Sequence, residues 1–176
     1  LDECHPYLEA MIIDSDNTSY NILLQKLGNG DGVAGAHKVN SFCEKLGLTR
    51  TEIHHGLVPG DGYFSDGKNN TTCPEDVAKF LELLYRSDVV SKSYSKEMLE
   101  LLKRCADDTG IVAGLAEGTE CAHKSGWADA YYLDGGIIYT EYKDYILVVF
   151  SDSSYQKPTQ EISQYVFSAI QSLYTK

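Results

Sequence analysis

The sequence predicts a mixed α and β protein in which helices come first and an antiparallel sheet follows. Two observations support this fold class. From residue 10 to about residue 110, apolar residues recur at the i, i+3, i+4, i+7 spacing of amphipathic helices. After Gly110 the pattern changes to short apolar runs bounded by glycine and aspartate, which is typical of strands.

Four helical segments are expected before the strands, together with an apolar stretch at residues 10–13. The first repeats Tyr20, Leu23, Leu24 and Leu27 and ends at Gly28, a residue suited to a helix C-terminus. The second runs from Ala36 to Leu46 and stops at Gly47. The third begins with a capping-box signature, Thr72 and Glu75, and the fourth is SKEMLELLKRCA at residues 95–106.

Three strands are expected next, at TECAHKSGW (119–127), GGIIYTEYK (135–143) and DYILVVFSD (144–152). A tight turn near Asp144 joins the last two, and a final helix starts at Pro158 and Thr159. Between the helices lies a polar stretch from Thr49 to Asn70 that is rich in glycine and proline. A loop of this length is usually functional or mobile.

Composition excludes several classes of function. The chain has 176 residues and a net charge of −11, so it lacks the basic surface that nucleic acid requires. No run approaches the roughly 18 apolar residues of a transmembrane helix. The five cysteines show no C-x-x-C spacing and leave any disulfide pairing undetermined, and the scattered histidines do not indicate a metal site. No metal or other cofactor is expected.

Two short polar motifs indicate chemistry. Ser15-Asp16-Asn17 interrupts two apolar helical segments, and residues of these types also serve as ordinary helix caps. Lys124-Ser125-Gly126 lies in a predicted strand, where a lysine is usually a solvent-facing charge. The two motifs together, about a hundred positions apart, are much less common than either one alone.

At these motifs the sequence resembles the class A β-lactamases and penicillin-binding proteins, whose signature includes Ser-Asp-Asn and Lys-Thr-Gly elements. The resemblance extends from Met11 to the last helix. It implies a β-lactamase/transpeptidase-like α+β sandwich, an antiparallel sheet flanked by helices, with a helical subdomain. The chain is expected to be a single, N-terminally incomplete domain over residues 1–176. Residues 10–110 would be its mostly helical part, and 111–176 would hold its last three strands and C-terminal helix.

The resemblance also implies roles for individual residues. Ser15 would relay a proton to the leaving nitrogen, and Lys124 would tune that proton and attract the substrate carboxylate. Asp16 would keep the loop in shape. The expected substrate-binding residues are Asn17, which holds the substrate amide, Ser125, which hydrogen-bonds its carboxylate, Gly126, which lets it lie along the strand, and Trp127, whose backbone amide is an oxyanion donor.

The sequence departs from the family pattern at the nucleophile. The family's Ser-x-x-Lys element precedes Ser-Asp-Asn, but the fourteen residues before Ser15 do not contain it. Ser93-Tyr94-Ser95-Lys96 has the Ser-x-x-Lys spacing, but it follows Ser-Asp-Asn instead of preceding it. We interpret Ser93 or Ser95 as a helix cap. The chain is therefore expected to be the C-terminal part of a longer serine hydrolase and inactive alone. The missing N-terminal segment would supply the nucleophile and two further strands.

The second departure lies in the long loop. Class A β-lactamases carry there a glutamate that activates the deacylating water, and counting without gaps from Thr49 places His55 at that position. The loop's carboxylates are Glu52, Asp61 and Asp66. Any of these four side chains could serve as a base, since carboxylates and imidazoles both act as general bases.

The resemblance implies a β-lactamase-like serine hydrolase that acts on β-lactams through an acyl-enzyme. Two alternatives remain open: a D-alanyl-D-alanine peptidase or penicillin-binding acyl-enzyme with slow deacylation, whose substrate would be of the acyl-D-alanine type, and a non-catalytic module that binds wall peptides or partners. The family implies a bacterial source and an extracellular or cell-envelope location.

Overall fold

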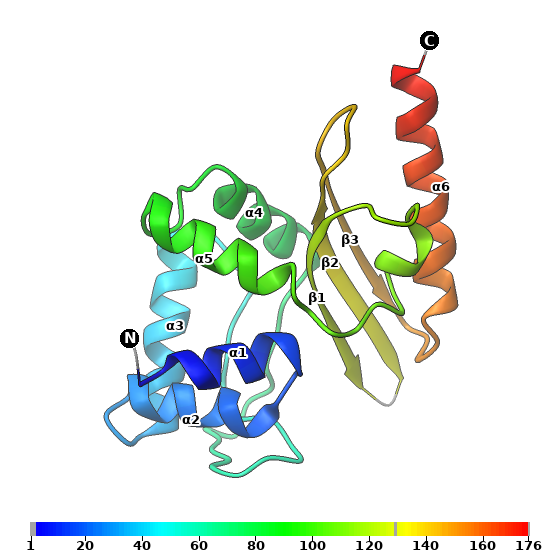
Figure 1. Cartoon of the computed structure of the whole chain (residues 1–176). Helices are drawn as coiled ribbons and strands as arrows, with labels where there is room; N and C mark the ends of the chain where they lie inside the picture. The colour runs from blue at the N-terminus through cyan, green and yellow to red at the C-terminus, as the bar shows by residue number, and fades with distance from the viewer. Residues whose placement is uncertain (1–2, 129, 176) are drawn as a thin grey trace. The chain divides into compact units, whose positions relative to one another are not determined.

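The computed structural model of the chain describes residues 3–128 and 130–175 (Figure 1). Internal contacts divide it into two compact units, Leu1–Asp76 and Val77–Lys176, which are described separately below. No helix among the described residues is both long enough and apolar enough to cross a bilayer. The single-domain organisation stays a prediction.

The first unit contains three helices joined by short connections: α1 (His5–Ile13), α2 (Asn17–Leu27) and α3 (Gly32–Lys45). α2 packs against both α1 and α3. The predicted ends of α2 and α3 are confirmed, because Gly28 is the C-cap of α2 and Gly47 follows α3 in the left-handed conformation at φ 73°. The apolar spacing and the glycines therefore identified these two helices and their C-terminal ends correctly.

Two predicted helix caps are wrong. α4 (Pro74–Tyr85) begins after Thr72, whose hydroxyl instead pairs with that of Thr51 at 3.0 Å. Proline at the first helical position fixes the start of the helix, because its ring already has the helical φ. α5 (Lys92–Leu102) is capped by the hydroxyl of Ser91, which accepts from the amide of Tyr94 at 3.3 Å.

Ser93 and Ser95 therefore lie inside α5 rather than before it. An N-cap residue needs an extended backbone, and Ser91 has it, with φ −149° and ψ 161°. Ser95 points into the apolar interior and is fully buried.

The second unit contains the antiparallel sheet in the order β1-β2-β3, as the sequence predicts. The strands are β1 (Cys121–Ala128), β2 (Tyr131–Ile138) and β3 (Tyr145–Ser151). β2 starts four residues earlier than expected, because Gly135 and Gly136 pair within the ladder instead of opening it. The turn near Asp144 is confirmed, since its carboxylate accepts from the amide of Thr140 at 3.1 Å.

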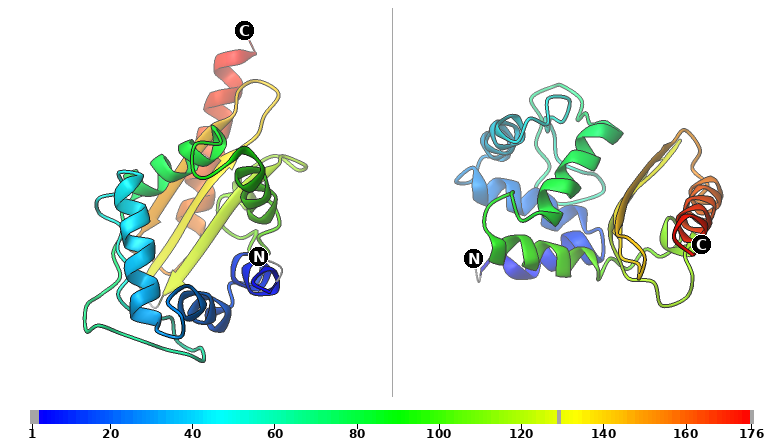
Figure 2. Two further views of the ribbon diagram at one scale, coloured as in Figure 1. Left: turned by 90° about the vertical axis from the view of Figure 1, so that its left-hand side faces the viewer. Right: turned by 90° about the horizontal axis from the view of Figure 1, so that it is seen from above.

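Helices cover the sheet within this unit. α6 (Lys157–Tyr174) packs against β3 and the short helix η1 (Val112–Gly114), and α5 packs against β1 (Figure 2). The core of this layer contains Ile111, Cys121 and Ile138. Ser163 of α6 donates to the carbonyl of Ile111 at 2.7 Å, which ties the helix to this core. β1 and β3 are the two edge strands of the described sheet.

The long loop, residues 49–70, belongs to the first unit and contains no helix and no strand longer than an isolated bridge. One face of α2 holds it. Asn21, with 0% of its surface exposed, donates to the carbonyls of Leu57 and Asp61 at 2.9 and 3.0 Å and accepts from the amide of Leu57 at 2.8 Å.

Two further side-chain hydrogen bonds between α2 and the loop come from residues at helical spacing from Asn21. Thr18 accepts from the amide of Asp61 at 3.1 Å, and Gln25 donates to the carbonyl of Gly62 at 3.0 Å. Positions 18, 21 and 25 lie on the same side of a helix. The loop is therefore fastened to α2 by three successive side chains.

Asn21→Leu should lower the free energy of unfolding by about 2 kcal/mol or more, since it leaves three loop backbone groups without their partner. Gln25→Leu is the matched control, because it removes a single such bond, and should cost about 1 kcal/mol. Urea denaturation followed by circular dichroism measures both. Equal effects of the two substitutions would contradict the assignment of Asn21 as the main fastening.

Candidate active site

The Ser15 segment connects α1 to α2 in a constrained conformation. Ser15 has φ 57°, a left-handed backbone that residues other than glycine seldom adopt. Both neighbouring turns hold it there. The amide of Asp16 donates to the carbonyl of Ala10 at 3.1 Å, and the Asp16 carboxylate caps α2 by accepting from the amide of Ser19 at 2.7 Å.

Hydrogen bonds from the hydroxyl and the amide of Ser19 also lower the pKa of the Asp16 carboxyl. Asp16 thus holds the connection between α1 and α2 in shape, and the side chain of Ser15 is exposed. A strained residue held by its surroundings is a feature of functional sites.

Asn17, the first residue of α2, lies beside the long loop. A Cβ atom added to Gly60 would lie 3.0 Å from the Cβ of Asn17, so the loop backbone approaches this residue closely. The first unit therefore brings together the Ser15–Asn17 segment and the part of the loop around Gly60.

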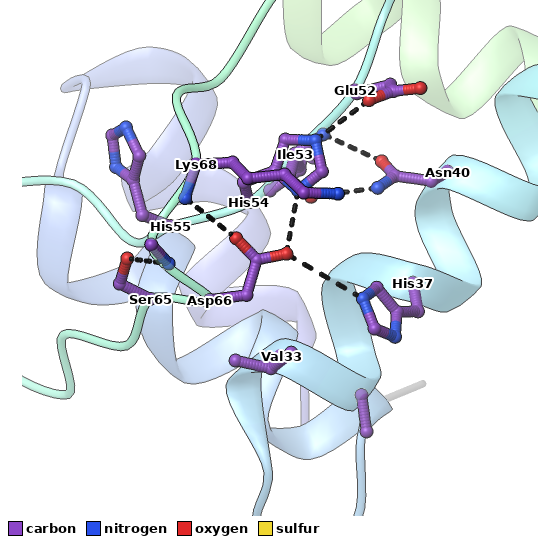
Figure 3. Close-up of polar contacts among 12 residues, drawn as sticks. Val33, His37, Asn40, Glu52, Ile53, His54, His55, Ser65, Asp66 and Lys68 are labelled. Atoms are coloured by element: carbon purple, nitrogen blue, oxygen red, sulfur yellow. Dashed lines mark hydrogen bonds and ion pairs between the residues drawn. The ribbon is translucent and has the colours of Figure 1, made fainter.

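The loop is held together by a buried histidine between two carboxylates (Figure 3). His54 is 7% exposed. Its Nδ1 lies 2.8 Å from Asp66 and its Nε2 lies 2.8 Å from Glu52. An imidazole can donate from both nitrogens only when it is protonated. The hydrogen bonds to Asp66 and then to Glu52 raise the pKa of His54, and His54 in turn lowers the pKa of Asp66.

His54 was not among the candidates from the sequence, which pointed to its neighbour. The Nδ1 of His55 lies 2.7 Å from the carbonyl of Gly56, so this ring is directed to its own backbone. Glu52 and Asp66 are both engaged with His54. The spacing Glu52-x-His54 could have indicated the contact between these two residues. In an extended segment, side chains two positions apart lie on the same side.

The clasp formed by Glu52, His54 and Asp66 should make stability depend on pH. A raised histidine pKa contributes stability fully below the ordinary value of about 6.5 and loses it as the pH rises through the folded value. As the pH rises above about 6.5, the urea midpoint should therefore fall less in His54→Gln than in the parent chain. His5→Gln, on a histidine whose side chain is 61% exposed, is the control and should keep the parental slope. If the urea midpoints of His54→Gln and the parent change in parallel with pH, a stabilising role of the protonated His54 in the clasp is contradicted.

The second unit holds the other motif on β1, an edge strand. Lys124 is half-buried, and its ammonium group donates to the carbonyl of Ser125 at 2.7 Å. Gly126 is exposed, and a Cβ atom there would meet no atom within 4 Å. The side chain of Trp127 is 68% exposed. This stretch of the strand is therefore open to a ligand lying along it.

Asp107 is a neighbour of this motif that the sequence did not indicate. Its carboxylate is hydrogen-bonded to the hydroxyl of Ser125 and accepts from Thr109 Oγ1 at 2.5 Å and from Tyr132 at 3.1 Å. Burial opposes its charge, but these hydrogen bonds lower the pKa of Asp107 to about 2. The Ser125 hydroxyl is therefore already engaged with Asp107. The Asp-x-Thr turn was the signal for this residue.

Each unit thus assembles one part of the predicted site: Ser15 and Asn17 in the first, and Lys124, Ser125, Gly126 and Trp127 in the second. Their assignment to catalysis and substrate binding stays a prediction. Within the described ranges, no group of three or more His, Cys, Asp or Glu side chains could hold a metal ion.

Comparison with known proteins identifies the family. Residues 5–170 match the family described as the beta-lactamase enzyme family. A beta-lactamase of Citrobacter koseri is 34% identical over 124 residues, which cover 65% of this chain and 37% of that protein.

Solved structures agree in fold. The structure of PBP-A superposes with a TM-score of 0.83 at 25% identity, covering 96% of this chain and 62% of that one. The TLA-3 extended-spectrum beta-lactamase gives 0.79 at 23% identity, covering 94% and 63%. This chain therefore spans less than two thirds of the length of these relatives. It belongs to the beta-lactamase enzyme family, in the group formed by the class A β-lactamases and PBP-A.

Proposed function

We propose that this chain forms the larger part of a penicillin-recognising serine hydrolase that reacts with β-lactams through a slowly deacylating acyl-enzyme. The observation that carries the proposal is the Lys124-Ser125-Gly126 motif on β1, an edge strand of the described sheet. An extended ligand can add to such an edge through backbone hydrogen bonds. A mutant of PBP-A, one of the structural relatives, has been captured as an acyl-enzyme complex with penicillin G.

The loop favours slow deacylation over rapid hydrolysis. A general base must reach the attacking water with a free lone pair. The carboxylates of Glu52 and Asp66 are both hydrogen-bonded to His54, so neither can turn toward a water without giving up that contact. The Nδ1 of His55 is bonded to the carbonyl of Gly56, which leaves the lone pair of its Nε2, and Asp61 is exposed. The engagement of two of the four candidate bases supports the penicillin-binding alternative over an efficient β-lactamase.

A segment outside these residues would supply the Ser-x-x-Lys nucleophile. Two surfaces support such a partner. β3 has no neighbour on its outer side among the described strands. α6 exposes four large apolar or aromatic side chains, Ile162, Tyr165, Leu173 and Tyr174. A protein completed in this way would act outside the cytoplasmic membrane, where its substrates occur. The alternative is a non-catalytic module without a nucleophile, which would bind wall peptides or partners along the Lys124-Ser125-Gly126 strand.

In a protein that joins this chain to a Ser-x-x-Lys segment, Lys124→Ala should slow acylation by penicillin G about ten- to hundred-fold, because it removes a charged contact to the substrate. The melting temperature should change little. Lys143→Ala, on an exposed lysine of the β2–β3 turn, is the control and should leave acylation unchanged. Intact-mass kinetics and thermal denaturation measure both quantities. An unchanged acylation rate with a large loss of stability would make Lys124 a structural residue and overturn the site.

A further inference from the structure

The second unit contains a cysteine, a histidine and an aspartate in hydrogen-bonded succession, which the proposed function does not use. The Cys105 thiol is hydrogen-bonded to the imidazole of His123. The Nδ1 of His123 lies 3.0 Å from Oδ1 of Asp134. The other oxygen of Asp134 accepts from the amide of Ile111 at 2.8 Å. An aspartate that orients a histidine next to a thiol is the arrangement that activates a cysteine nucleophile.

The strand register places this histidine and aspartate together. His123 pairs with Gly136 and Ser125 pairs with Asp134, so both charged side chains lie on one face of the sheet at a diagonal. His123 is 2% exposed and Asp134 is 1% exposed. Gly136 is needed here, because a Cβ atom at that position would lie 2.6 Å from the Cβ of His123.

The charges around Cys105 favour its thiolate. His123 and Lys124 on β1 are the positive groups. Asp134 on β2 is negatively charged and acts on the sulfur through His123. Asp107 lies in the segment that follows α5, as Cys105 does, and its backbone amide is hydrogen-bonded to the sulfur. Burial opposes the thiolate, but the hydrogen bonds from His123 and from this amide lower the pKa of Cys105. Burial would likewise lower the pKa of His123, but Asp134 and Cys105 raise it to about 9.

The other cysteines provide contrasts within the same chain. All five thiols are free. Cys43 is half-buried like Cys105, but burial and the charge of Asp76 raise its pKa. Cys121 lies on the same face of the sheet as His123, where burial raises its pKa to about 12. Position in the fold, rather than exposure alone, therefore distinguishes Cys105.

We propose that Cys105 is a modification site at which the thiolate, paired with the imidazolium of His123, reacts with small disulfides and other soft electrophiles. The Cys105 sulfur attacks one sulfur of the disulfide and forms a new S–S bond. The original S–S bond breaks, and the departing thiolate takes a proton from water, so no external oxidant is required. The modified residue would lie two positions from Asp107, the hydrogen-bond partner of Ser125.

The test is competitive alkylation of the 176-residue chain with iodoacetamide at about pH 6.5, where an ordinary thiol is almost entirely protonated. Peptide mapping by mass spectrometry follows each cysteine separately. Cys105 should be alkylated about ten-fold or more faster than Cys43, and its rate should titrate with a lower midpoint. Oxidised glutathione should then give one mixed disulfide, at Cys105.

Asp134→Asn tests the positioning role, because it keeps the shape and removes the charge that orients His123. It should slow alkylation of Cys105 and move the pH midpoint upward, while the rate at Cys43 stays constant and reports an intact fold. If Asp134→Asn does not fold, the comparison of Cys105 with Cys43 in the parent chain still decides. Equal rates and equal pH midpoints at these two cysteines would overturn the proposal.

Discussion

The hydrogen bonds between Asn21 and the loop backbone determine where the loop lies on α2, because this side chain is fully buried and bonds three loop groups at once. α2 also carries Asn17 at its first turn, directly after the strained Ser15. One helix therefore positions both the polar segment before it and the loop beside it. A loop that is fastened in this way is a defined surface of the first unit, and its side chains have specific partners.

Both units use a buried histidine with a carboxylate partner, but the two histidines have different consequences. His54 lies between two carboxylates, so its positive charge is fully compensated and the arrangement holds the loop together. His123 has one carboxylate partner and one thiol partner. The second ring nitrogen of His123 is therefore available to donate to a thiolate at Cys105. The same residue type is thus structural in one unit and activating in the other, according to what faces its second nitrogen.

The sequence predicted the helices, the three strands of an antiparallel sheet and the family, because apolar spacing and short motifs are local signals. It failed where the partner of a residue is distant in sequence. His54 meets Asp66 only because the loop folds back at the bridge between His55 and Ser65. His123 meets Asp134 because of the register between β1 and β2, which no spacing rule provides. The cap of α4 failed for a local reason, since Pro74 overrides the signature at Thr72.

Because the loop is fastened in this way, we propose that a protein containing these residues forms an acyl-enzyme with a β-lactam more readily than it releases the product. Acylation would depend on the nucleophile, Ser15 and Lys124, whereas release depends on a base in the loop. General-base assistance is typically worth about 10²- to 10⁴-fold in rate, and the carboxylates of Glu52 and Asp66 are already engaged with His54.

The most direct measurement is the pre-steady-state hydrolysis of a chromogenic cephalosporin by a protein that joins this chain to a Ser-x-x-Lys segment. We expect a burst of about one equivalent of product, followed by slow steady turnover as the acyl-enzyme accumulates. Rapid hydrolysis without a burst would contradict it, because a loop side chain would then be acting as an efficient base.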